Sequence, residues 1–129
     1  MSVQLNHTIV AARDKETSAK FLAGMLGVPV GPRFGPFVPV EVSNGVTLDF
    51  ADTGGEAITA QHYAFLVSEN EFDAIFGRIR DAGVAYYADP RHGQPQQINH
   101  RDGGRGVYFD DPNGHNLEIL TRPYGSGPA

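Results

Sequence analysis

Hydrophobic and polar residues follow one another along the chain in an order that occurs twice. The order is a strand, a helix and then further strands, first over residues 3–53 and again over residues 58–122. The strands show the two-residue period of half-buried sheets, and the helices show apolar residues at three- and four-residue spacing. The repeat predicts two related modules in a single domain of residues 1–129, ending in a flexible tail at 123–129.

The first half is expected to contain a helix between strands. Its expected elements are a strand, a helix, a loop or short strand interrupted by three prolines, and two strands, over residues 3–11, 14–26, 29–36, 37–42 and 46–52. Asp14 is placed to cap the helix, and Gly27 is a natural stop. Asn44-Gly45 between alternating segments is a strong signal for a hairpin.

The second half repeats this order with a longer polar loop. Its expected elements are a strand, a helix, a short strand, a loop and two final strands, over residues 61–67, 70–82, 84–88, 89–104, 106–109 and 116–121. The helix carries Phe72, Ile75, Phe76 and Ile79 on one face and ends at Gly83. A turn at residues 111–114 joins the last two strands, and the chain is expected to fray from Arg122 onwards.

The composition allows a real hydrophobic core and restricts the chemistry. The chain has 129 residues, of which 40% are hydrophobic and 10% aromatic, as is usual for a globular protein. It has no cysteine, which excludes disulfides, thiolate metal sites and a cysteine nucleophile. Any metal must therefore be held by His, Asp, Glu or backbone oxygen.

The charge and hydropathy pattern exclude two classes of partner. The formal net charge is −5, and the 10 Lys and Arg residues are scattered, so no basic face for nucleic acid is expected. No apolar run is long enough to span a membrane, and no charged and apolar leader begins the chain. We therefore expect a soluble cytoplasmic protein that binds neither nucleic acid nor membrane.

The two halves also match at positions with metal-binding chemistry. Residues 6–10 correspond to residues 61–65, and residues 46–50 correspond to residues 115–119. Each half thereby has one histidine in its first strand and one carboxylate in its last strand. An internal repeat of this kind indicates that the four positions are related.

These four residues, His7, His62, Asp49 and Glu118, lie in strands that we expect to be central and buried. A buried imidazole needs partners for its ring nitrogens, and an unpaired buried carboxylate is unfavourable. Together they favour convergence on a cation. Two imidazoles and one carboxylate, here His7, His62 and Glu118, form a facial triad that leaves coordination positions for a substrate.

Asp49 has two open roles. It is either a fourth oxygen ligand of a six-coordinate ion or, because its side chain is one methylene shorter than Glu, a partner of a water or a neighbouring residue. A lone strand histidine is often structural, with its ring bonded to backbone, so the metal hypothesis depends on the whole set. His92 and His115 are expected at the surface in loops.

The duplicated pattern and these residues resemble the vicinal-oxygen-chelate superfamily over about residues 3–122. That group includes glyoxalase I, extradiol dioxygenases, fosfomycin-resistance transferases and bleomycin-resistance proteins. The resemblance implies an α+β fold of two βαβββ modules, whose curved mixed sheets form a ligand cup closed by homodimerisation. It places the metal ligands at His7, His62 and Glu118, and Asp49 where glyoxalase I has a glutamate. The ligands come from one chain or are shared by two.

A local motif near the end is similar to the signature of extradiol dioxygenases. It comprises residues 98–100, residues 107–114 and Glu118. The resemblance implies that His100 transfers a proton and that Tyr108 donates a hydrogen bond to substrate, roles that suit a bound catecholate. On the residues alone, a plain strand role is favoured for Tyr108 over a catalytic one, and His100 is equally a solvent-exposed residue.

Three functions remain open at this point. The first is an enzyme that uses a divalent metal (Fe, Mn, Ni, Co or Zn) on a small molecule with vicinal oxygens, by glyoxalase-type or dioxygenase-type chemistry. The alternative is a resistance protein that sequesters an antibiotic without catalysis. The third is a scaffold domain without a site. Aromatic walls for a ligand are expected from Phe34, Phe37, Tyr63 and Tyr87.

Overall fold

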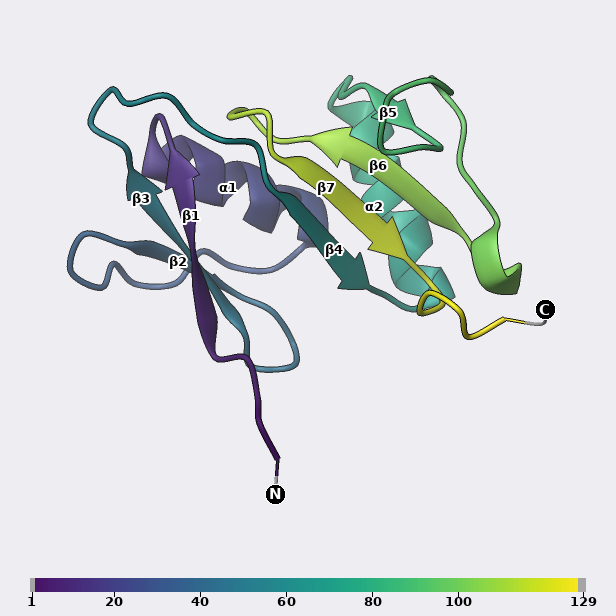
Figure 1. Cartoon of the computed structure of the whole chain (residues 1–129), viewed down its shortest axis with the longest axis horizontal. Coiled ribbons are helices and arrows are strands. Elements are labelled where there is room, and N and C mark those ends of the chain that lie inside the picture. Colours follow the sequence, from purple (N-terminus) through teal and green to yellow (C-terminus); the bar gives the residue numbers. More distant parts are fainter. Residues whose placement is uncertain (1, 128–129) are drawn as a thin grey trace. The chain divides into compact units, whose positions relative to one another are not determined.

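The structure, a computed structural model, describes residues 2–127. The chain divides into two compact units, Met1–Thr59 and Ala60–Ala129, and the described part of each contains one mixed sheet and one α-helix (Figure 1). This confirms the expected α+β class, and no closed barrel is present among the described residues. None of the helices in that part of the chain is long and apolar enough to cross a membrane.

The first unit has a three-stranded sheet beside one helix. Its elements in chain order are β1 (His7–Ala12), α1 (Lys15–Leu26), β2 (Val38–Glu41) and β3 (Thr47–Asp52). Strand β3 lies centrally, parallel to β1 and antiparallel to β2. The Asp14 carboxylate accepts the backbone N–H groups of Glu16 and Thr17 at the start of α1, and Gly27 ends the helix in the left-handed conformation.

A fourth strand, implied by the resemblance, is missing from the described part of the first unit. Between α1 and β2 the chain makes only an isolated bridge between Phe34 and Phe37. Pro29, Pro32 and Pro36 punctuate this segment, and proline has no N–H to donate to a strand ladder. The segment is therefore a loop, and this half is βαββ.

The second unit contains the complete βαβββ order. Its elements are β4 (His62–Leu66), α2 (Glu69–Asp81), β5 (Tyr86–Tyr87), the short 3-10 helix η1 (Arg101–Gly103), β6 (Gly106–Asp110) and β7 (Asn116–Leu120). The strand order is β4-β7-β6-β5, with β4 parallel to β7. Ser68 and Glu71 form a reciprocal capping box at the start of α2.

The two faces of the second sheet differ in what covers them. One face packs against α2 (Figure 1), with buried apolar side chains from both the helix and the strands: Phe72, Ile75, Ile79, Val107, Phe109, Leu117 and Ile119. Side chains alternate along strands, so the opposite face, which we call the site face, carries the residues between them. These include His62, Tyr87, Tyr108, Asn116 and Glu118.

The strand register reproduces the sequence repeat. In the first sheet Ile9 pairs with Asp49, two residues after His7. In the second sheet Ala64 pairs with Glu118, two residues after His62. His7 and Asp49 therefore occupy the same places in their sheet as His62 and Glu118 occupy in theirs.

One expectation about these strands is wrong. Both β1 and β4 lie at an edge of their sheets within residues 2–127, and the side chains of His7 and His62 are exposed rather than buried. The error arises because an alternating pattern identifies a strand with one buried face but does not reveal its place in the sheet. In β1 the buried residues are Val10 and Ala12, so the face with His7 points away from the core.

Candidate metal centre

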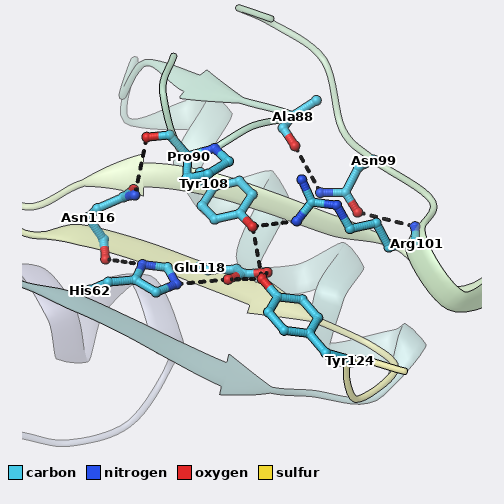
Figure 2. Close-up of polar contacts among 9 residues, drawn as sticks. All are labelled: His62, Ala88, Pro90, Asn99, Arg101, Tyr108, Asn116, Glu118 and Tyr124. Carbon is cyan, nitrogen blue, oxygen red and sulfur yellow. Dashed lines mark hydrogen bonds and ion pairs between the residues drawn. The ribbon is translucent and has the colours of Figure 1, made fainter. Parts of the chain in front are cut away.

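The second unit pairs a strand histidine with a buried carboxylate (Figure 2). Nε2 of His62 lies 3.0 Å from Oε1 of Glu118, although the two residues are 56 positions apart in the chain. Glu118 is only 1% exposed. The pairing follows from the parallel β4–β7 ladder, which sets both side chains on the site face.

The second ring nitrogen of His62 determines what its partner can be. Nδ1 lies 3.0 Å from the backbone carbonyl oxygen of Asn116, and a carbonyl only accepts, so Nδ1 carries the hydrogen. In a neutral ring Nε2 then presents a lone pair to the carboxylate of Glu118. Two acceptors 3.0 Å apart require a proton or a cation between them. A histidine fixed through its other nitrogen in this way has the usual arrangement of a metal ligand.

A chain of hydrogen bonds supports the carboxylate from the other side (Figure 2). The Tyr124 hydroxyl lies 2.7 Å from both Oε1 and Oε2 of Glu118, and 2.9 Å from the Tyr108 hydroxyl. Nη1 of Arg101 donates to the Tyr108 oxygen at 2.6 Å. Since each hydroxyl donates once, the bonds run from Arg101 through Tyr108 and Tyr124 to Glu118.

The electrostatics of the site fix the donor-to-acceptor direction of these hydrogen bonds. Burial, reinforced by the hydrogen bonds with Tyr108 and Glu118, raises the pKa of Tyr124 well above its ordinary value. Tyr124 therefore remains a neutral phenol that donates to the carboxylate. The positive charge of Arg101 and the negative charge of Glu118 stand at opposite ends of the two phenols, so each bond is favourable.

The first unit contains a simpler version of the same arrangement. Nδ1 of His7 lies 2.7 Å from the side-chain oxygen of Asn6, so Nδ1 again carries the hydrogen and Nε2 keeps the lone pair. Asp49 is half-buried on the same face of the sheet. Among residues 2–127, no group of three or more His, Asp or Glu side chains is poised to hold a metal ion. The ligand set of His7, His62, Asp49 and Glu118 stays a prediction.

The two predicted catalytic residues have different surroundings. Tyr108 is 1% exposed, and its hydroxyl belongs to the hydrogen-bond chain described above. His100 is exposed at the start of η1. The side chain that reaches Tyr108 belongs to the next residue, Arg101, whose guanidinium also lies over the Tyr108 ring at 5.6 Å.

The four residues predicted to form aromatic walls around a ligand lie in different parts of the structure. Tyr87 lies opposite Tyr108 on the site face and stacks on His92, with ring centroids 3.9 Å apart. Tyr63 pairs with Leu117 and therefore lies on the helix-covered face, so it is not a wall of the site face. The reason is the strand alternation, which sets Tyr63 opposite to its neighbour His62.

Phe34 and Phe37 belong to the first unit, next to each other in a bridge. Phe34 is 73% exposed and Phe37 is half-buried. Their predicted contact with a ligand stays a prediction.

The expectation that His115 lies at the surface is wrong. His115 is 1% exposed, and its Nδ1 accepts the backbone N–H of Gln61 at 3.0 Å. The turn before it is closed by the Asp111 carboxylate, which accepts N–H groups from Asn113 and His115. This turn directs the ring inward beside the edge of Tyr63. His92 is half-buried, with Nε2 3.2 Å from Asp110.

The described part of the predicted flexible tail makes specific contacts, and its flexibility stays a prediction. Tyr124 bonds to Glu118, while the Asp102 carboxylate accepts the backbone N–H groups of Gly125 and Gly127. A glycine-rich, proline-containing end looks disordered by composition, because composition does not show which side chain elsewhere receives its N–H groups. Residues 128 and 129 lie outside the described residues.

The comparisons with known proteins agree with this fold. The chain matches the Glyoxalase/Bleomycin resistance protein/Dioxygenase superfamily over residues 4–119 and belongs to that family. A solved structure of similar sequence is named Oxidase ChaP-H2, at 70% identity and a TM-score of 0.96, with 99% of this chain and 100% of that chain covered. Oxidase ChaP-H1 is similar at 58% identity and a TM-score of 0.93, over 96% and 99% of the two chains.

A curated relative has a different kind of name. It is the glutathione transferase FosA of Serratia marcescens, 28% identical over 92% of this chain and 81% of its own length. A solved glyoxalase/dioxygenase from Nostoc punctiforme, 23% identical with a TM-score of 0.72 and covering 93% of this chain and 91% of that one, shares the fold. The superfamily thus joins oxidase and transferase names on one scaffold.

Proposed function

We propose that this protein is a metal-dependent oxidase that acts on a small molecule with two vicinal oxygens. The observation that carries the proposal is Nε2 of His62, which faces Oε1 of the buried Glu118 at 3.0 Å while its Nδ1 is bonded to backbone. The oxidase class is supported by the names of the two relatives at 70% and 58% identity.

The proposed ligands are His7, His62 and Glu118, and Asp49 is the candidate for a fourth oxygen donor. Both histidines bond through Nδ1 to an oxygen acceptor, so both offer Nε2 as the donor atom. Two imidazoles and a carboxylate suit Fe(II), Mn, Ni, Co or Zn. Such an ion would supply Lewis-acid chemistry and open positions for the two substrate oxygens.

The other residues of the site face suit a planar, oxygen-bearing substrate. The stacked rings of Tyr87 and His92, with centroids 3.9 Å apart, offer a flat surface for an aromatic molecule. The guanidinium of Arg101 uses one N–H on the Tyr108 oxygen at 2.6 Å, and its other N–H groups would hold a negatively charged substrate oxygen. A catechol-like diol combines both features.

We also infer that two copies of the chain associate. Strands β1 and β4 each leave one edge unpaired within residues 2–127, and exposed strand edges favour pairing. Ile9 on β1, and Val3 and Leu5 in the segment just before it, add exposed apolar side chains. His7 then meets His62 and Glu118 either in its own chain or in a second copy. Light scattering coupled to gel filtration measures the association, and a monomer at all concentrations would contradict it.

The test is oxygen consumption by metal-free protein that is reloaded anaerobically with Fe(II). We expect uptake with catechol-type substrates that depends on the metal and is lost in His62→Ala. Conversion of methylglyoxal–thiol adducts without oxygen uptake would instead indicate glyoxalase chemistry. Tight binding of an antibiotic by metal-free protein, with no turnover of any substrate, would replace the enzyme with a sequestering protein.

A further inference from the structure

We infer that Tyr124, brought in by the C-terminal segment, is a positioning residue of the site that orients Glu118 for metal binding. This inference rests on the function proposed above. It concerns a residue outside the strands and outside the predicted ligand set. We call residues 123–127 the C-terminal strap.

Within residues 2–127, the Glu118 carboxylate has two side-chain hydrogen-bond partners, His62 and Tyr124. His62 contacts Oε1 at 3.0 Å, whereas Tyr124 contacts both oxygens at 2.7 Å. A donor at equal distances from both oxygens lies near the bisector of the carboxylate. That place is where a cation chelated by both oxygens would lie, so the phenol leaves Oε1 on the His62 side as the coordinating atom.

Tyr124 itself is held from two directions. Its hydroxyl accepts from Tyr108 at 2.9 Å, and Tyr108 is a buried strand residue with Arg101 behind it. A carboxylate ligand that accepts a fixed hydrogen bond keeps its geometry, and loss of such a partner typically lowers metal affinity about 10- to 100-fold.

The strap is fastened away from the metal ligands. Oδ2 of Asp102 accepts the N–H of Gly125 at 3.1 Å, and Oδ1 accepts the N–H of Gly127 at 3.2 Å. A Cβ atom added to Gly127 would lie 2.3 Å from the Cα of Asp102, so only glycine fits. Asp102 and Gly127 thus allow the strap to be released without any change to the site residues.

The experiment measures Zn²⁺ and Co²⁺ binding by calorimetry to the full metal-free chain and to three variants. Tyr124→Phe removes only the hydroxyl, Gly127→Ala displaces the strap, and Tyr86→Phe is the matched control. Tyr86 lies on the helix-covered face, edge-on to Phe76. The visible spectrum of the Co²⁺ forms reports the geometry of the metal ligands. If Tyr124 had a purely structural role, Tyr124→Phe would leave this spectrum unchanged.

We expect about tenfold weaker binding and an altered Co²⁺ spectrum for Tyr124→Phe, a smaller loss for Gly127→Ala, and no change for Tyr86→Phe. Unchanged or tighter binding by Tyr124→Phe, with the wild-type spectrum, would overturn the inference and leave the proposed function standing. If the wild-type chain itself binds neither ion, the proposed function and this inference both fall.

Discussion

The two units place a histidine and a carboxylate at the same register positions but treat them differently. In the first unit His7 is exposed and Asp49 half-buried, and within residues 2–127 the His7 ring bonds only to its neighbour Asn6. In the second unit Glu118 is 1% exposed and contacts both His62 and Tyr124. The duplication places a histidine and a carboxylate in each sheet. Additional segments of the second unit supply the hydrogen-bond donors and the positive charge that stabilise its buried carboxylate.

Those added segments are the loop before β6 and the C-terminal strap. The loop contributes Arg101, and the strap contributes Tyr124. The first unit instead passes from α1 to β2 through a proline-rich loop. A carboxylate needs compensating donors or charges when it is buried, so the asymmetry predicts that Glu118 contributes more to metal affinity than Asp49 does.

The largest expected effect is the loss of either histidine. His62→Ala removes a proposed ligand and the partner of a buried carboxylate, so binding of a divalent ion should be abolished, a decrease of at least about 1000-fold, larger than the loss of an outer partner. His7→Ala should also abolish binding, because the triad needs both rings. Equilibrium dialysis with elemental analysis measures both. Full metal stoichiometry in His62→Ala would reject the site, and in His7→Ala it would remove the first unit from it.

A second prediction compares the carboxylates. Glu118→Gln keeps the shape of the side chain and removes its charge. It should weaken Zn²⁺ binding about 100-fold or more, which exceeds the usual loss when a hydrogen-bond partner of a metal ligand is removed. Asp49→Asn should weaken Zn²⁺ binding by about tenfold or less, since the Asp49 side chain is shorter and, within residues 2–127, lacks the hydrogen-bonded tyrosines that support Glu118. Calorimetric titration of both variants decides the order. Equal losses would show that the two halves contribute alike.

A third prediction concerns stability rather than binding. His115→Ala leaves the Gln61 N–H without its acceptor and empties a buried ring site, so it should lower the free energy of unfolding by about 2–4 kcal/mol. The corresponding residue of the first half is Val46, which is half-buried, and Val46→Ala should cost about 1 kcal/mol. Urea denaturation measures both. A cost below that of Val46→Ala would contradict the structural role of His115.

The smallest expected effect concerns the two helix caps, Asp14 of α1 and Ser68 of α2. Ser68→Ala and Asp14→Ala should each lower the free energy of unfolding by about 1 kcal/mol. The backbone and side chain of Ser68 hold the pKa of Glu71 below its usual value of 4.5. The contribution of this box is therefore present above pH 4.5 and lost as the pH falls through the lowered pKa. Denaturation of Ser68→Ala against wild type at neutral and acid pH checks this, and a pH-independent difference would contradict it.

The sequence predicted most of the regular structure because local signals agree with it. Asp14 and Gly27 bound α1 where capping chemistry places them, and Gly45 turns the β2–β3 hairpin at a positive φ of 85°. These are short-range or periodic features, which do not depend on the tertiary arrangement.

The rest of the site could not be predicted because it depends on contacts distant in the chain. Tyr124 bonds to Glu118 from a strap whose N–H groups are accepted by Asp102, and no periodicity relates these residues. The inward direction of His115 depends on the turn closed by Asp111. A proline after Thr121-Arg122 and an aromatic residue six positions from the carboxylate were the only available signals for the strap, and both are common in ordinary tails.

The central claim is that one divalent ion is held by His7, His62 and Glu118. The most direct measurement is an anomalous difference map at the zinc edge from crystals grown with Zn²⁺. We predict one strong peak about 2.0–2.2 Å from Nε2 of both histidines and from an oxygen of Glu118. A map without a peak between His62 and Glu118, or with a peak there that no copy of His7 approaches, would contradict the account.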